Sequence, residues 1–193
     1  MNNIVFEPYI GPTYETSKCR LLLVGESHYD EPSAAPSEST RTVVEKWQSG
    51  EWNSRYLTTA ARIICNKEAD QIERKSALDG VAFYNFVQTM MVKGEAPTSS
   101  QARASLDAFL EVLRLHSPTH IIMGSYVAWD HSAADHSKEG TLSLDGMTFK
   151  ARLYSTPKGE AVAIPLPHFS RASAPEWQKA VMEFLQLGKS SLT

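Results

Sequence analysis

Apolar runs alternate with amphipathic stretches along the chain, which is the pattern of a parallel sheet covered by helices on both faces. Four runs are short, rich in aliphatic side chains and followed by a break, as buried parallel strands are. They predict strands at residues 20–24, 80–83, 120–123 and 161–166. The first is the clearest, because the apolar run stops abruptly at Gly25.

Helical periodicity fills the gaps between these strands. Residues 55–67 carry apolar side chains at helical spacing, and residues 101–116 place a second apolar stripe on one face. Ser99 or Ser100 is suited to cap the second of these helices, because a serine hydroxyl can accept from a free backbone N–H of the first turn.

The C-terminal part of the chain predicts one more helix. It begins at the run Ser173-Ala174-Pro175-Glu176, where Ser and Glu have capping-box spacing and Pro fits the first turn, and it ends near Gly188. We expect residues 189–193 to form a flexible tail. The whole chain, residues 1–193, then forms a single domain.

Two segments interrupt the alternation. Residues 31–40 contain Pro, Ser and Ala and are typical of a surface loop, whereas residues 141–157 predict a hairpin of weaker strands that turns at Asp145-Gly146. Either segment could border a pocket.

Each predicted strand ends in a cluster of polar side chains. The clusters are Gly25-Glu26-Ser27-His28-Tyr29, Tyr84-Asn85, Gly124-Ser125-Tyr126 and His168-Phe169-Ser170-Arg171. Because open α/β sheets bind ligands beyond the carboxyl ends of their strands, we expect these clusters to share a cleft. The expected fold is α/β, a three-layer α/β/α sandwich with a central, mainly parallel four-stranded sheet.

Composition limits the classes of function. The chain has 193 residues, 42% of them hydrophobic, and a net charge of −3, which argues against a basic coat for nucleic acid. A local patch stays open, since Arg103, Arg114, Arg152, Lys158 and Arg171 could converge. Cys19 and Cys65 lack the paired spacing of zinc or iron–sulfur sites, so we expect free thiols in a reducing compartment. No stretch reaches membrane-spanning length, and the cytoplasm is the expected location.

The order of these motifs resembles the uracil-DNA glycosylase superfamily. The resemblance runs from residue 21 to about residue 170: a strand ending in Gly25-Glu26 and a polar turn, then Phe83-Tyr84-Asn85-Phe86-Val87, then the strand 118–124, and last a turn similar to His-Pro-Ser at His168-Phe169-Ser170. The middle portion is most similar to the bacterial and archaeal branch whose first motif is Gly-Glu-Ala-Pro-Gly, although the cluster cysteines of that branch are absent.

The resemblance implies a base that is flipped out of DNA and released by hydrolysis of its N-glycosidic bond. Asn85 would read the edge of the base, because an amide offers both a donor and an acceptor. Tyr56, or second Trp52, would stack on the base. His168 would stabilise the negative charge that develops on the departing base.

The same resemblance assigns the remaining site residues. Gly25 would let the backbone approach the base, Glu26 would polarise the attacking water, and Ser170 with Arg171 would hold the flanking phosphates. The expected catalytic residues are thus Glu26, Ser27 and His168, and the expected substrate-binding residues are Gly25, His28, Tyr29, Tyr56, Asn85, Gly124, Ser170 and Arg171. We expect a nucleic acid partner with a flipped or single-stranded base, and no cofactor, metal, membrane or protein partner.

The motifs depart from the family at three positions. Ser27 stands where the best-known branch has Asp, and His28 and Phe169 stand where family members have Pro. A serine cannot replace a carboxylate electrostatically, so a catalytically weak or inactive module that binds a nucleobase or nucleic acid stays open as an alternative. Ordinary structural roles stay open too: Asn85 as a buried amide between strand ends and Tyr56 as plain core.

The sequence also contains residues suited to two other chemistries. Ser27 beside His28, or Ser170 near His168, offers a serine next to a base, but neither lies in a Gly-x-Ser-x-Gly elbow. A metal-assisted hydrolase is the third hypothesis, because imidazole and carboxylate groups suit a metal ion. Its candidate ligands are His28, Asp30, Asp130, His131, Asp135 and His136.

Overall fold

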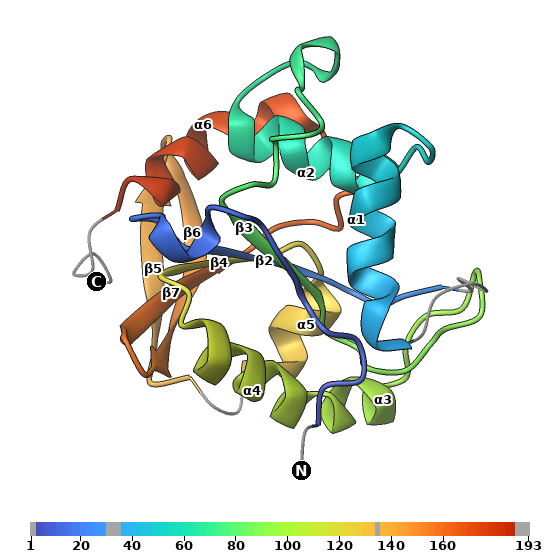
Figure 1. Cartoon of the computed structure of the whole chain (residues 1–193). Helices are drawn as coiled ribbons and strands as arrows, with labels where there is room; N and C mark the ends of the chain where they lie inside the picture. Colours follow the sequence, from blue (N-terminus) through green and yellow to red (C-terminus); the bar gives the residue numbers. More distant parts are fainter. Residues whose placement is uncertain (1–2, 30–35, 134–135, 188–193) are drawn as a thin grey trace.

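The centre of the protein is a seven-stranded mixed sheet (Figure 1), in a computed structural model that describes residues 3–29, 36–133 and 136–187. The strands are β1 (Tyr9–Ile10), β2 (Leu21–Gly25), β3 (Val81–Asn85), β4 (His120–Met123), β5 (Lys138–Leu144), β6 (Met147–Thr156) and β7 (Gly159–Pro165). Their order in the sheet is β1-β3-β2-β4-β7-β6-β5. The predicted α/β class is confirmed.

The four predicted strands are neighbours in this sheet and pair in parallel, in the order β3-β2-β4-β7. The sheet has seven strands where the pattern predicts four. β1 adds to β3 in antiparallel register, and it is too short, at two residues, to show a period in the sequence. The predicted hairpin turns at Asp145 and Gly146 as expected, but β6 pairs with β7 and so extends the sheet, with Arg152 opposite Ala163.

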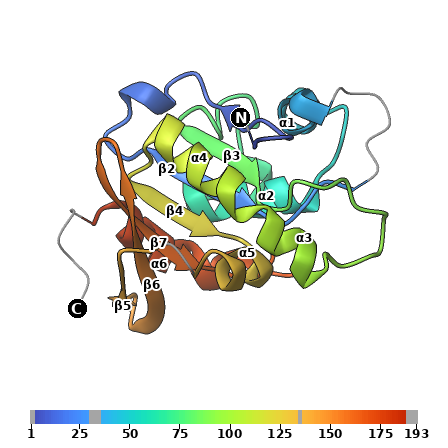
Figure 2. The same cartoon turned by 90° about the horizontal axis from the view of Figure 1, so that it is seen from below.

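The helices lie on both faces of the sheet (Figures 1 and 2). They are α1 (Ser39–Ser49), α2 (Arg55–Cys65), α3 (Ser99–Ala104), α4 (Leu106–His116), α5 (Tyr126–His131) and α6 (Ala174–Leu185), with short 3-10 turns η1 (Tyr14–Thr16), η2 (Pro36–Glu38) and η3 (Ala69–Gln71). α1, α2 and α6 cover one face, and α3, α4 and α5 cover the other. None of the helices in the described part of the chain combines the length and the apolar character needed to cross a bilayer.

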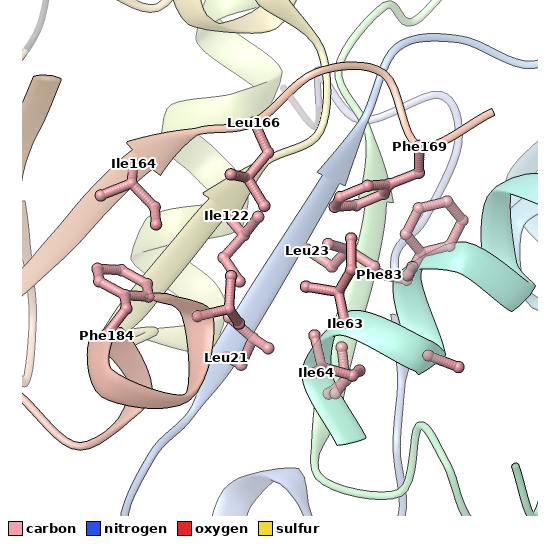
Figure 3. Close-up of a cluster of buried hydrophobic side chains, with 14 of the residues drawn as sticks. Leu21, Leu23, Ile63, Ile64, Phe83, Ile122, Ile164, Leu166, Phe169 and Phe184 are labelled. Carbon is pink, nitrogen blue, oxygen red and sulfur yellow. The ribbon is translucent and has the colours of Figure 1, made fainter. Parts of the chain in front are cut away.

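Both faces of the central strands are buried, which explains their continuous apolar runs. Alternate residues of β2 point to opposite sides: Leu21 and Leu23 join the core under α2 and α6, and Leu22 and Val24 join the core under α4. Figure 3 shows part of the first core, where side chains of the central strands meet those of α2 and α6. It labels Leu21, Leu23, Ile63, Ile64, Phe83, Ile122, Ile164, Leu166, Phe169 and Phe184.

The predicted helix at residues 101–116 is divided into α3 and α4 at Ser105. The buried Ser105 hydroxyl donates to the Gln101 carbonyl at 2.8 Å and accepts from the Gln88 N–H at 2.9 Å, so it ties the break to a neighbouring loop. The cap is Thr98, which forms a capping box with Gln101, and neither predicted serine holds that position.

The C-terminal part of the chain differs in detail from the prediction. α6 begins after Ser173 with Pro175 in its first turn, as predicted, but the Ser173 side chain makes no capping hydrogen bond and the helix ends at Leu185. The predicted tail at residues 189–193 lies outside the described residues.

Two helices, α1 and the six-residue α5, were not predicted from the pattern. The predicted loop at 31–40 overlaps the first turn of α1, where Ser39 and Thr40 are fully buried, and residues 30–35 lie outside the described part of the chain. Val43, Val44 and Trp47 are the buried apolar stripe of α1 and were the available signal.

Candidate functional site

A cavity of about 670 Å³ opens beyond the carboxyl ends of the parallel strands. Three of the four polar clusters expected to share a cleft contribute to its lining, and the cluster Gly124-Ser125-Tyr126 after β4 does not. The lining includes most of the expected site residues: Glu26, Ser27, His28, Tyr29, Tyr56, Asn85, His168, Ser170 and Arg171. Of the expected site residues, only Gly25 and Gly124 are not part of this lining. The structure therefore brings together residues that lie more than 140 positions apart in the chain.

The turn after β2 is held by the segment after β3. The Gly25 carbonyl accepts from Phe86 N–H at 3.1 Å, and the Glu26 carbonyl accepts from Val87 N–H at 2.8 Å. Further along, the His28 carbonyl accepts from Met91 N–H at 2.8 Å. These backbone bonds extend the parallel pairing past the strand ends and fix the side chains of Glu26 and His28 at the cavity.

The Glu26 carboxylate is oriented by two hydroxyl groups. Tyr29 Oη donates to Oε1 at 3.2 Å, and Ser125 Oγ donates to Oε2 at 2.9 Å. Ser125 is fully buried at the start of α5, where its hydroxyl also accepts from Ala128 N–H at 3.4 Å. Each carboxylate oxygen has more than one lone pair, so Glu26 can still accept a hydrogen bond from a water in the cavity.

Asn85 is bound to His28 at the bottom of the site. The Asn85 Nδ2 atom lies 3.1 Å from His28 Nε2, and that nitrogen lies 2.9 Å from Thr40 Oγ1 on α1. Burial lowers the pKa of His28 to about 4, so its ring is neutral at pH 7. A Cβ added at Gly25 would lie 2.2 Å from Asn85 Oδ1, so the glycine makes room for the Asn85 side chain.

His168 is half-buried, and its proton position follows from its neighbour. The Ser170 N–H donates to His168 Nδ1 at 3.4 Å, which places the proton of the neutral ring on Nε2. Burial lowers the pKa of His168, and the negative charge of Glu26 opposes that effect. His168 therefore carries a neutral N–H donor near pH 7.

Tyr56 packs among aromatic rings at the cavity wall. Its ring centroid lies 5.0 Å from His168 and 5.1 Å from Phe169. Its hydroxyl donates to the Val24 carbonyl at 3.4 Å, and burial raises the pKa of the phenol. A Cβ at Gly124 would lie 2.7 Å from Tyr56 Oη and 2.6 Å from a Phe169 ring carbon, so Gly124 permits this packing.

Phe169 is fully buried in the core of Figure 3. It anchors the turn after β7 to the hydrophobic core. The adjacent His168 is thereby held at the cavity by a buried neighbour.

Several lining residues had no counterpart in the sequence analysis. They are Asn53, Ser54 and Arg55 at the start of α2, and Lys93, Gly94, Glu95 and Ala96 in the loop before α3. Trp52, the second candidate for stacking, also lines the cavity and is 40% exposed. A second cavity of about 560 Å³ adjoins the first and has Asn53, Ser54, Arg55 and Arg171 in common with it.

The basic residues considered for a local patch do not gather around this cavity. Arg171 lines it, but three of the others form ion pairs elsewhere. The pairs are Arg114 with Glu111, Arg152 with Glu139 and Lys158 with Glu15. Positive charge at the cavity comes from Arg171 together with Arg55 and Lys93, which were not part of the expected patch.

The residues considered for a metal site are not assembled in the described structure. Among residues 3–29, 36–133 and 136–187, no three His, Cys, Asp or Glu side chains are grouped to hold a metal ion. Asp30 and Asp135 lie outside these ranges. Cys19 and Cys65 are free thiols, as expected.

In comparisons with known proteins, neither a family model nor a curated protein matches this chain.

Proposed function

We propose that this protein is a uracil-DNA glycosylase-like hydrolase that cleaves the N-glycosidic bond of uracil or a damaged base in DNA. The fold proposed with it is the three-layer α/β/α sandwich of that superfamily. The observation that carries the proposal is the convergence of Glu26, Asn85 and His168 on one cavity from three different strand ends. A carboxylate, an amide and a neutral imidazole are the groups that this reaction needs.

Base recognition is assigned to Asn85 and Tyr56. The Asn85 amide offers a donor and an acceptor to the edge of a base that enters the cavity. Tyr56, or Trp52 at the more exposed side, offers a ring against which the base can stack. Arg171 and Ser170 lie at the same cavity and are suited to the phosphates that flank an extruded nucleotide.

Bond cleavage is assigned to His168 and Glu26. The C1′–N bond breaks and its electron pair leaves with the base, so negative charge develops on the base and positive charge on the sugar. His168 Nε2–H stabilises the base anion by donating a hydrogen bond. Glu26 holds the water that adds to C1′ and accepts the proton that this water releases, and the base anion is protonated from solvent.

One observation favours a second candidate, a binding module with weak or no catalysis. Ser27 occupies the position at which the best-known branch has an Asp, and a hydroxyl cannot carry the charge of a carboxylate. Such a module would bind a nucleobase or a nucleic acid in the same cavity and leave the glycosidic bond intact.

Purified protein is incubated with uracil-containing single- and double-stranded oligonucleotides, which are then treated with alkali to break abasic sites. We expect cleavage by the wild type that is lost in Glu26→Gln, Asn85→Ala and His168→Ala. Glu45→Gln, an exposed carboxylate of α1, serves as the matched control and retains the wild-type rate. Saturable binding of an intact oligonucleotide by folded protein would instead support the binding module.

A further inference from the structure

His28 is the most buried polar side chain in the described lining of the cavity, with 3% of its surface exposed. Its ring makes an edge contact with Phe6 at 4.9 Å between centroids, and the backbone bond to Met91 fixes its carbonyl. Little of the ring is available to a ligand. Its polar contacts are to Asn85 and Thr40, so its influence on a bound base passes through them.

The contact between His28 and Asn85 has two chemically distinct forms. If His28 Nε2 carries no proton, it accepts from the Asn85 amide nitrogen; if Nε2 is protonated, it donates to the amide oxygen. The two forms differ by a half-turn of the amide group. In the structure the amide nitrogen, Nδ2, faces His28 at 3.1 Å, which is the first form.

The surroundings are compatible with this form. Burial keeps His28 neutral at pH 7, since its pKa is lowered to about 4, and a neutral ring has one nitrogen without a proton. Thr40 Oγ1 lies 2.9 Å from Nε2, and a hydroxyl can donate to a bare nitrogen. Asn85 Oδ1 is then turned toward Gly25, where only a residue without a Cβ leaves space.

We propose that His28 is a positioning residue that fixes the orientation of the Asn85 amide and thereby sets which base the cavity accepts. This inference rests on the proposed function. Uracil presents an N3–H donor beside an O4 acceptor, whereas cytosine presents an N3 acceptor beside an N4–H donor. An amide held in one orientation matches one of these edges, and a half-turn of the amide would match the other.

The first test measures the rate of base release from single-stranded oligonucleotides that carry one uracil or one cytosine. The wild type is expected to prefer uracil, and His28→Leu, which removes the acceptor, is expected to lower the uracil-to-cytosine ratio by about 10- to 100-fold. His28→Gln, whose amide oxygen can accept from Asn85, is expected to restore most of the ratio. Thr40→Val, which removes the other contact of Nε2, is expected to keep it within about 3-fold.

A purely structural role predicts a different result. In that case His28→Leu and His28→Gln would lower both rates equally and leave the ratio at the wild-type value, which would overturn the proposal. A wild type that releases neither base contradicts the proposed function instead, and the amide assignment is then decided by spectroscopy alone.

The second test observes the wild-type ring directly and needs neither activity nor a variant. Nitrogen NMR of labelled protein at pH 7 is expected to show His28 Nε2 without a proton and a hydrogen-bond coupling to the Asn85 side-chain amide. A proton on His28 Nε2, with the amide N–H groups of Asn85 bonded elsewhere, would overturn the proposal.

Discussion

The four parallel strands carry polar residues at both ends, but only those at the carboxyl ends line the cavity of the candidate site. At the carboxyl ends, Glu26, Asn85 and His168 line a cavity. At the amino ends, Cys19 Sγ lies 3.3 Å from His120 Nδ1, and Arg20 Nε donates to the Ser117 carbonyl at 2.8 Å. These amino-end side chains line neither of the two cavities described above.

The difference teaches that polar side chains at strand ends do not make a site by themselves. At the amino ends Thr119 Oγ1 contacts His120 Nδ1 at 2.9 Å, and His120 Nε2, which is buried without a hydrogen-bond partner in the described residues, borders neither cavity. At the carboxyl ends Glu26 retains lone pairs and His168 retains an N–H donor, and both border open volume. Unused hydrogen-bonding capacity beside a cavity is what allows chemistry.

Glu26→Gln is expected to have the largest effect. Loss of the carboxylate removes the acceptor for the proton of the attacking water, so base release should slow by about 10²- to 10⁴-fold. Chemical denaturation measures the free energy of unfolding in parallel, and we expect little change there. If Glu26→Gln retains the wild-type rate, a group other than Glu26 must bind the attacking water.

Substitution of His168 is expected to have the next largest effect on base release. His168→Ala should slow base release by about 10²- to 10³-fold, as removal of one donor to a developing anion does. Because burial lowers the pKa of His168, the neutral ring persists at pH 7 and the wild-type rate should fall only as the pH drops below 6.5. This decline should be absent from the residual activity of His168→Ala. A rate that rises as the pH falls would contradict the role of the neutral ring.

His28 should make stability depend on pH. Its folded pKa of about 4 lies below the unfolded value of about 6.5, so the unfolded chain takes up a proton first. This contribution to stability is complete above pH 6.5 and is lost as the pH falls toward 4, by an amount on the order of 3 kcal/mol. Urea denaturation of the wild type and of His28→Gln at pH 6.5 and at pH 4 measures how much of the free energy of unfolding is lost through His28. An equal loss in the two proteins would mean that other groups cause the pH dependence.

Substitution of Ser125 should have a smaller effect on base release, because Ser125 acts through the Glu26 carboxylate. Ser125→Ala removes one of the two hydroxyl groups that orient the carboxylate, and base release should slow by about 10-fold. Kinetics at saturating substrate should show the loss in kcat, since Ser125 is not part of the cavity lining. A change confined to KM would mean that Ser125 acts on binding.

Substitution of His120, at the amino ends of the strands, should have the smallest effect on the rate of base release. His120→Leu removes the contacts with Cys19 and Thr119 and should lower the free energy of unfolding by about 1–2 kcal/mol. The rate of base release should stay at the wild-type value. Reduced release by the folded variant would show that the two ends are coupled.

Much of the parallel sheet could be predicted from the sequence. Buried strands such as β2 and β4 are continuous apolar runs, and a glycine ends β2, so their places follow from local pattern. β1 and the pairing of β6 with β7 could not be predicted, because both depend on hydrogen bonds between distant segments. α1 was missed because its few apolar residues follow a polar stretch that resembles a loop.

The candidate site, like the sheet, could be predicted only in part from the sequence. The sequence by itself determined that polar clusters follow the strands, and three of the four clusters meet at one cavity as the parallel order predicts. Only the tertiary structure decided what each group does there: Ser125 orients Glu26, His28 holds Asn85, and Gly124 makes room for Tyr56. These contacts join residues 57 to 99 positions apart, and their distances follow from how the layers pack, which a local pattern does not record.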